Sequence, residues 1–130
     1  MADLWRHQAD AIRIADPRAG SLIGHDGGTG KSRTAIALLE RWGARRVLVT
    51  CPLSVCGVWP EQLRRHAESP WRVERLDSGS IAARADRARA ALESPAERVV
   101  VVVNHEAVWR GAFGALAMGA RWDALVADEA

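Results

Sequence analysis

Lysine, cysteine and long apolar stretches are all scarce in this sequence. Lys31 is the only lysine among 18 basic residues, and every other one is arginine. Cys51 and Cys56 are the only cysteines, and no secretory signal stands at the amino end, so we expect two reduced thiols and no disulfide. The longest unbroken apolar stretch, residues 99–103, is far shorter than the roughly twenty residues that a membrane-spanning helix needs. Disulfide scaffolds and membrane spans are therefore excluded, and we expect a cytoplasmic protein that no membrane holds.

Spacing disfavours a metal site, and net charge leaves the partner open. A zinc site would require the two cysteines to recruit His66 or His105, and the spacing fits no common zinc pattern. The net charge of +2 argues neither for nor against a nucleic-acid partner. With 130 residues, 48% apolar and 26% charged, the chain has the length and composition of one globular domain.

Runs typical of strands alternate along the chain with runs typical of helices. We expect strands at residues 21–24, 47–50, 72–76, 98–103 and 122–127, and helices at residues 31–42, 59–67, 81–93 and 107–118. Gly43 is suited to end the first helix, and Ser78 or Ser80 to cap the third. Continuous apolar strands of this kind are typical of parallel sheets with helices on both faces. The pattern predicts a single α/β domain over residues 1–130.

A glycine-rich run ending in the lone lysine follows the first expected strand and leads into a helix. It reads Gly27-Gly28-Thr29-Gly30-Lys31-Ser32. Glycines allow the backbone to approach an anion closely, and N–H groups at a helix amino end attract phosphate. The compact ammonium of Lys31 suits the β and γ phosphates of a nucleotide, and the Ser32 hydroxyl suits Mg²⁺. The run therefore predicts a phosphate-binding loop.

Two other interpretations fit this run less well. A plain glycine-rich turn needs neither the Lys-Ser pair nor a helix directly behind it. A dinucleotide fingerprint would require glycine at Arg33, where the helix has already begun. The full phosphate-loop pattern also departs at one position, because it places glycine where this chain has His25.

An acidic pair follows the last expected strand. Asp128 and Glu129 stand at the carboxyl end of that strand, where parallel α/β sheets bind their ligands. In nucleotide hydrolases the first acid at such a position holds Mg²⁺, and the second polarises the water that attacks the γ-phosphate. An acidic pair alone is usually a solvated strand end, but its combination with Lys31 favours the catalytic interpretation.

Together these blocks resemble the amino-terminal ATP-binding lobe of the Swi/Snf-type branch of superfamily-two helicases and DNA translocases. The resemblance runs from residue 4 to residue 130. It includes Leu4-Trp5-Arg6-His7-Gln8, whose glutamine would read the adenine edge, and Cys51-Pro52-Leu53-Ser54 followed by Trp59-Pro60-Glu61, beside the DNA backbone in the family. Ser54 or nearby backbone amides would contact phosphate oxygens. Trp59 suits packing better than base stacking. His105 departs from the family, which often has tyrosine there.

The resemblance implies a P-loop (RecA-like) three-layer sandwich with a mainly parallel sheet, truncated after the Asp-Glu strand and so incomplete at its carboxyl end. It also implies ATP and Mg²⁺ as cofactors, and double-stranded DNA as the favoured partner of the complete enzyme. A second lobe, which a separate polypeptide would carry in a split enzyme, would supply the arginine finger needed for efficient turnover. Two alternatives stay open: another P-loop enzyme such as a small-molecule kinase, and a non-catalytic remnant.

Overall fold

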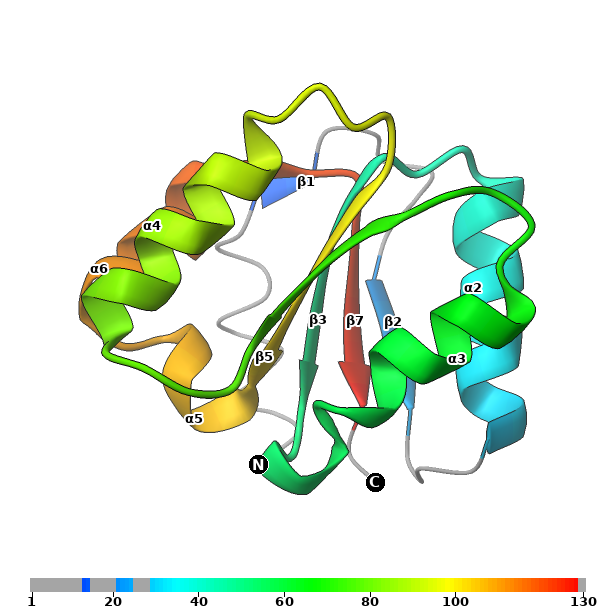
Figure 1. The fold of residues 1–130 in the computed structure, drawn as a ribbon, viewed down its shortest axis with the longest axis horizontal. Coiled ribbons are helices and arrows are strands. Elements are labelled where there is room, and N and C mark those ends of the chain that lie inside the picture. The colour runs from blue at the N-terminus through cyan, green and yellow to red at the C-terminus, as the bar shows by residue number, and fades with distance from the viewer. Residues whose placement is uncertain (1–12, 15–20, 25–28, 129–130) are drawn as a thin grey trace.

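A computed structural model describes residues 13–14, 21–24 and 29–128, with side chains from Arg33 onward. It is an α/β structure built on a five-stranded sheet with the order β2-β7-β3-β5-β4, in which every neighbouring pair is parallel (Figure 1). A separate two-stranded parallel sheet pairs β1 with β6. The predicted α/β class with a parallel sheet between helices is thus confirmed.

The strands are β1 (Arg13–Ile14), β2 (Ser21–Gly24), β3 (Arg46–Cys51), β4 (Arg72–Leu76), β5 (Val99–Asn104), β6 (Arg121–Trp122) and β7 (Ala124–Asp128). The helices are α2 (Thr29–Arg41), the 3-10 turn η1 (Leu53–Val55), α3 (Val58–His66), α4 (Ile81–Leu92), α5 (His105–Val108) and α6 (Gly111–Gly119).

The helices are divided between the two faces of the sheet. Helices α2 and α3 lie on one face, and α4, α5 and α6 lie on the other (Figure 1). Crossovers between parallel strands are right-handed as a rule. Accordingly, the chain covers one face while moving from β2 through β3 to β4, and the other while returning through β5 to β7. The direction of travel reverses between β3 and β5, and α/β sheets commonly bind ligands at the carboxyl ends of the strands beside such a point.

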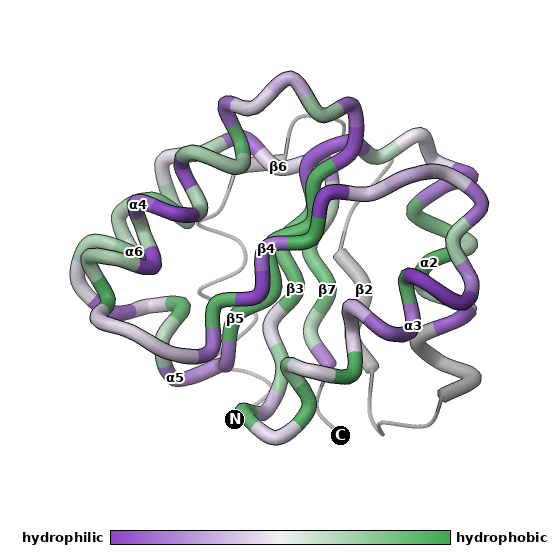
Figure 2. The backbone as a smooth tube through the Cα atoms, viewed as in Figure 1, coloured by the Kyte–Doolittle hydropathy of each residue, from purple (hydrophilic) through white to green (hydrophobic). Residues whose placement is uncertain are grey.

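Alternate residues of the central strands pack into two separate cores. Odd-numbered positions of β5 face α4 and α6, together with Leu48 and Leu125. Even-numbered positions of β5 face α2 and α3, together with Val49 and Val126. All six residues of β5 are buried, and the central strands form the hydrophobic middle of the molecule (Figure 2). This two-residue period decides which face each side chain at a strand end will reach.

Two predicted elements differ from the structure. The helix expected at residues 107–118 is two helices, α5 and α6, separated by Trp109 and Arg110. Gly111, the first residue of α6, has a φ of +46°, a left-handed conformation that glycine adopts readily. The strand expected at residues 122–127 is interrupted at Asp123, whose carboxylate accepts hydrogen bonds from the backbone N–H groups of Arg45 (2.8 Å) and Arg46 (2.9 Å). Both breaks come from local backbone requirements that hydrophobic pattern does not reveal.

The predicted helix ends are confirmed. Gly43 has a φ of +71° in the turn that follows α2, two residues after its last residue Arg41. The Ser80 hydroxyl accepts a hydrogen bond from the Ala83 N–H at 3.1 Å, which caps α4. Within the described ranges, no helix has the length and apolarity needed to span a membrane.

Candidate nucleotide-binding site

The end of β2 and the acidic residue Asp128 lie side by side at the carboxyl edge of the sheet. Strands β2 and β7 are parallel neighbours, and Gly24, the last residue of β2, is the register partner of Asp128. Neighbouring strands lie about 4.8 Å apart. The connection from β2 to α2, which contains Gly27 and Gly28, therefore leaves the sheet directly beside Asp128.

Helix α2 begins inside the glycine-rich run, two residues before the predicted start. Thr29, Gly30, Lys31 and Ser32 form its first four residues, and no acidic residue lies in its first turn. The amino end of a helix carries unpaired N–H groups and a partial positive charge, and both favour an anion. Only the backbone of these four residues is described, so the ammonium of Lys31 and the hydroxyl of Ser32 lie outside what the structure describes.

Asp128 is a buried carboxylate with an indole donor. It is 6% exposed, and it shares its strand parity with Ala124 and Val126, which face α2 and α3. From that same face Trp59, in the first turn of α3, donates its indole N–H to Oδ2 of Asp128 at 3.2 Å. A buried charge is stabilised only by such partners, so Trp59 helps to keep this acid at the sheet edge.

His105 holds the backbone at the same point. Its Nε2 lies 2.9 Å from the carbonyl oxygen of Asp128. A carbonyl can only accept, so Nε2 must carry the hydrogen. His105 is the first residue of α5, after β5, and β3 lies between β5 and β7. The imidazole therefore links the ends of two strands that are not neighbours.

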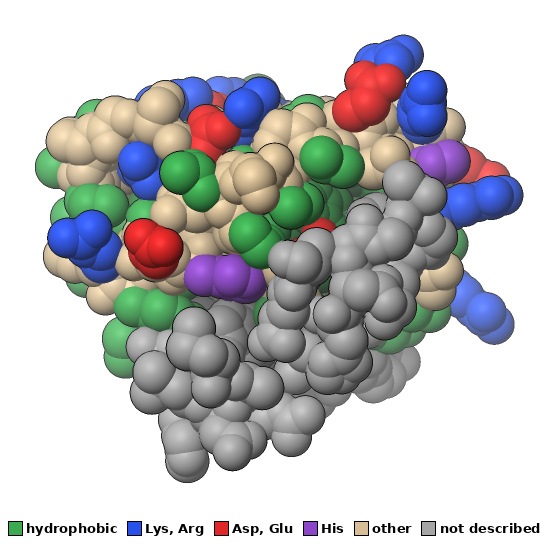
Figure 3. Space-filling model, turned by 90° about the horizontal axis from the view of Figure 1, so that it is seen from below, with side chains coloured by type: hydrophobic (Ala, Val, Ile, Leu, Met, Phe, Trp, Pro, Cys, Tyr) green, Lys and Arg blue, Asp and Glu red, His purple; other side chains and the backbone are tan. Residues whose placement is uncertain are grey.

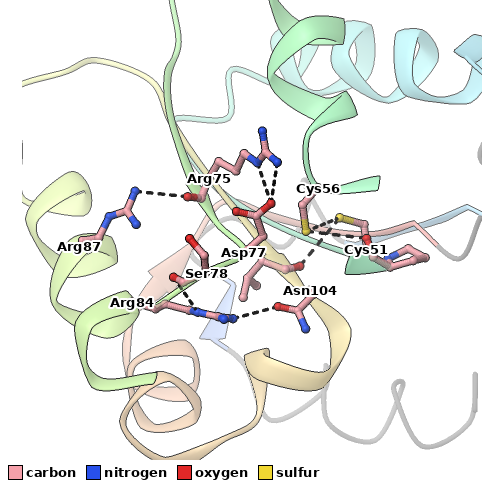
Figure 4. A network of polar contacts seen from close by, with 10 residues as sticks. Cys51, Cys56, Arg75, Asp77, Ser78, Arg84, Arg87 and Asn104 are labelled. Carbon is pink, nitrogen blue, oxygen red and sulfur yellow. Dashed lines mark hydrogen bonds and ion pairs between the residues drawn. The ribbon is translucent and has the colours of Figure 1, made fainter. Parts of the chain in front are cut away.

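A polar network lies near the ends of β3, β4 and β5 (Figure 4). Arg84 donates to the carbonyl oxygens of Ser78 (3.1 Å) and Gly79 (3.0 Å), and to Oδ1 of Asn104 (3.0 Å). Arg75 forms an ion pair with Asp77 at 2.8 Å. Both guanidinium groups are bonded to protein acceptors, which indicates that they hold the segments at these strand ends together.

The two thiols lie on the β3 side of this network. The sulfur atoms of Cys51 and Cys56 are 3.4 Å apart, and both residues are buried. The hydrogen bond between the two sulfur atoms, in which either thiol can donate, lowers the pKa of Cys56. The same bond, together with burial, raises the pKa of Cys51. Among the described residues no group of three or more His, Cys, Asp or Glu side chains forms a metal site.

The predicted site residues divide into three groups. Gln8, Gly27, Gly28 and Glu129 lie outside the described residues. Thr29, Gly30, Lys31 and Ser32 are described by their backbone only, at the start of α2. Asp128 is described in full.

Two residues near the sheet edge are informative about DNA contact and packing. Ser54, predicted to contact DNA phosphate, is exposed on η1. Trp59 is 2% exposed and packs in the core on the α2 and α3 face, as its predicted packing role requires, so its ring is not available to stack on a base.

Sequence reasoning missed the two partners of Asp128. Trp59 was expected only to pack, and His105 was noted only as a departure from the family pattern. No local signal connects either residue with position 128, because the contacts span 69 and 23 residues of sequence. The one available signal is the alternation of side chains along the last strand. Asp128 follows Val126 by two residues and therefore lies on the same face of the sheet, which α3 covers.

The molecule seen from the carboxyl edge of the sheet has a mixed surface. Where residues are described, hydrophobic side chains gather towards the middle of this face, and arginine and acidic side chains lie around them (Figure 3). Leu53 in η1 and Val58 in α3 are exposed apolar residues, at 58% and 40% exposure.

No protein-family model matches the chain, and a search of curated proteins finds no significant relative.

Proposed function

We propose that this chain is the ATP-binding lobe of a DNA-dependent ATPase of the helicase and translocase type, with a P-loop fold. The observation that carries the proposal is the register of Gly24 with Asp128. It brings the start of the glycine-rich connection alongside a buried carboxylate. Lys31, whose charge is opposite to that of the carboxylate, is in the first turn of α2, the helix that follows the same connection.

The chemistry expected at this edge is electrostatic. A triphosphate would lie against the amino end of α2, where N–H groups and Lys31 neutralise its negative oxygens. Ser32 and Asp128 would hold Mg²⁺, which binds oxygen ligands and shares the phosphate charge. Glu129 would orient the attacking water, and Gln8 would read the adenine edge. Buried Asp128 fits this role, because carboxylate oxygens are ligands that Mg²⁺ binds.

The nucleic-acid partner is the second part of the proposal. The η1 turn and the start of α3 carry the block that resembles the DNA-contacting segment of the family, and Ser54 is exposed there. Contacts from hydroxyls and backbone amides to phosphate hold DNA without reading its sequence. We therefore propose double-stranded DNA as the track, with DNA-stimulated hydrolysis as its signature.

The central experiment is the binding of Mg-ATP to Lys31→Ala. Loss of a charge-assisted phosphate contact costs about 1.5–3 kcal/mol, so we expect affinity to fall roughly ten- to hundredfold. Arg33→Ala is the matched control, because it removes one positive charge from the same helix at an exposed position. Affinity should stay near the wild-type value in the control. Unchanged affinity in Lys31→Ala would refute the phosphate-loop assignment.

Lys31→Arg tests the chemistry of the lone lysine. A guanidinium is a broad planar fork, and it cannot replace a compact ammonium beside tightly wrapped backbone. We expect the arginine variant to bind Mg-ATP nearly as weakly as the alanine variant. A phosphorylated small-molecule product, formed without DNA stimulation, would instead support the kinase alternative.

A further inference from the structure

The environment of Asp128 differs from that of an ordinary strand end. Its side chain accepts a hydrogen bond from the buried indole of Trp59, and its backbone carbonyl accepts one from His105. One contact comes from α3 on one face of the sheet, and the other from α5 on the opposite face. The last described residue of β7 is thus fixed by side chains from both layers.

A comparison with Trp122 shows that this use of an indole is specific. Trp122 is as deeply buried as Trp59, and its indole N–H donates to the backbone oxygen of Ala117 at 3.0 Å, five residues earlier. That bond satisfies a buried donor locally, as packing alone demands. Trp59 instead donates to a charged side chain 69 residues away. An N–H to carboxylate bond fixes the orientation of the carboxylate, because the last torsion of aspartate is otherwise broad.

The sequence around Trp59 supports a rigid donor. Pro60 follows it within the first turn of α3, where proline fits without losing a helical hydrogen bond. Leu63, one turn further, is buried in the same core as Trp59. The indole is therefore held by the helix that carries it, and its N–H cannot turn to another acceptor without unpacking α3.

We propose that Trp59 is a positioning residue for the metal ligand Asp128, and that His105 fixes the backbone from which that ligand projects. This inference rests on the proposed function, because it assigns Asp128 the Mg²⁺ of a bound nucleotide. Hydrogen-bond partners of metal ligands orient those ligands, and their loss typically lowers metal affinity by about 10- to 100-fold. Trp59 touches neither nucleotide nor metal in this scheme and acts only through the carboxylate.

The test measures ATP affinity with Mg²⁺ and with a chelator in place of Mg²⁺. In the wild type, Mg²⁺ should strengthen binding. In Trp59→Phe, which keeps an aromatic ring and removes the N–H, the gain due to Mg²⁺ should shrink about tenfold, while metal-free binding stays unchanged. Trp122→Phe is the matched control, and its gain should equal that of the wild type. An undiminished gain in Trp59→Phe would overturn the inference and leave the proposed function intact.

Failure of the proposed function gives a different result. In that case the wild type itself binds no ATP under either condition, and both proposals fall together. A double-mutant cycle separates positioning from general packing. If Trp59 acts through Asp128, then Trp59→Phe should cause no further loss of the Mg²⁺ gain in an Asp128→Asn background. A full additional loss there would contradict the inference.

A second measurement needs no substitution at Trp59 and so does not depend on the folding of the variant. In the nitrogen-15 spectrum of the wild type, the indole N–H signal of Trp59 should shift when Mg-ATP is added, and not when ATP is added with a chelator. The signal of Trp122 should stay in place under both conditions. If the chain binds Mg-ATP and the indole N–H signal of Trp59 does not shift, the inference is overturned.

Discussion

Gly24 and Asp128 are register partners at the carboxyl ends of the parallel strands β2 and β7. They are separated by most of the chain, and the sheet order β2-β7-β3 is what makes them neighbours. A phosphate loop and a metal-binding acid must lie within reach of the same triphosphate. This one pairing places the strand end from which the proposed loop departs beside the proposed metal ligand.

Glu129→Gln separates binding from hydrolysis. The amide keeps the size of the side chain and removes the charge that would polarise water. We expect Mg-ATP affinity within a factor of about two of the wild type and a loss of turnover of roughly 100-fold or more. Binding is measured by titration, and turnover by phosphate release in the presence of DNA. Turnover that survives the substitution would remove Glu129 from the chemistry.

Glu40→Gln tests the bond between α2 and the segment after α3. The Glu40 carboxylate accepts hydrogen bonds from the backbone N–H groups of Glu68 (3.1 Å) and Ser69 (2.8 Å), and from the indole of Trp71 (3.3 Å). Burial by itself raises the pKa of Glu40, but these bonds together outweigh it and lower the pKa. We expect Glu40→Gln to lose about 1–2 kcal/mol of unfolding free energy at neutral pH.

The pH dependence of that loss has a definite sign. Because the pKa of Glu40 is lower in the folded state, its contribution is fully present above the ordinary glutamate pKa of about 4.3 and disappears as pH falls through the lower folded-state pKa. Denaturant unfolding of the wild type and Glu40→Gln across this window measures it. Glu93→Gln, at an exposed position, is the control, and its unfolding free energy at neutral pH should stay near that of the wild type. A pH-independent difference for Glu40→Gln would contradict the assignment.

Cys51→Ala tests the coupling of the two thiols. The sulfur of Cys51 lies 3.4 Å from that of Cys56, and its hydrogen bond lowers the pKa of Cys56. Removal of the Cys51 thiol should raise the pKa of Cys56, so the ultraviolet thiolate absorbance of the variant should appear at higher pH than in Cys51→Ser, which keeps a hydrogen-bonding group at this position. Identical titration curves for the two variants would show that the sulfur contact does not determine the pKa of Cys56.

Much of the fold followed from the sequence because its signals are local. The valine run in β5 and the helical spacing in α2 predicted elements with nearly the observed bounds, and Gly43 and Ser80 marked helix ends through backbone and capping chemistry. The break before Gly111 was missed, because neither periodicity nor composition reports the sign of one φ angle.

The amino-acid order alone determined which chemical groups are present and which elements carry them. The lone Lys31 lies in the first turn of a helix, at the end of a glycine-rich run, and Asp128 is the last residue of an apolar strand. Only tertiary structure decided that β7 lies against β2, that Trp59 donates to Asp128, and that His105 reaches the same residue from the opposite layer. The physical reason is range: propensity and periodicity act over a few residues, whereas strand order and side-chain hydrogen bonds depend on how whole layers pack.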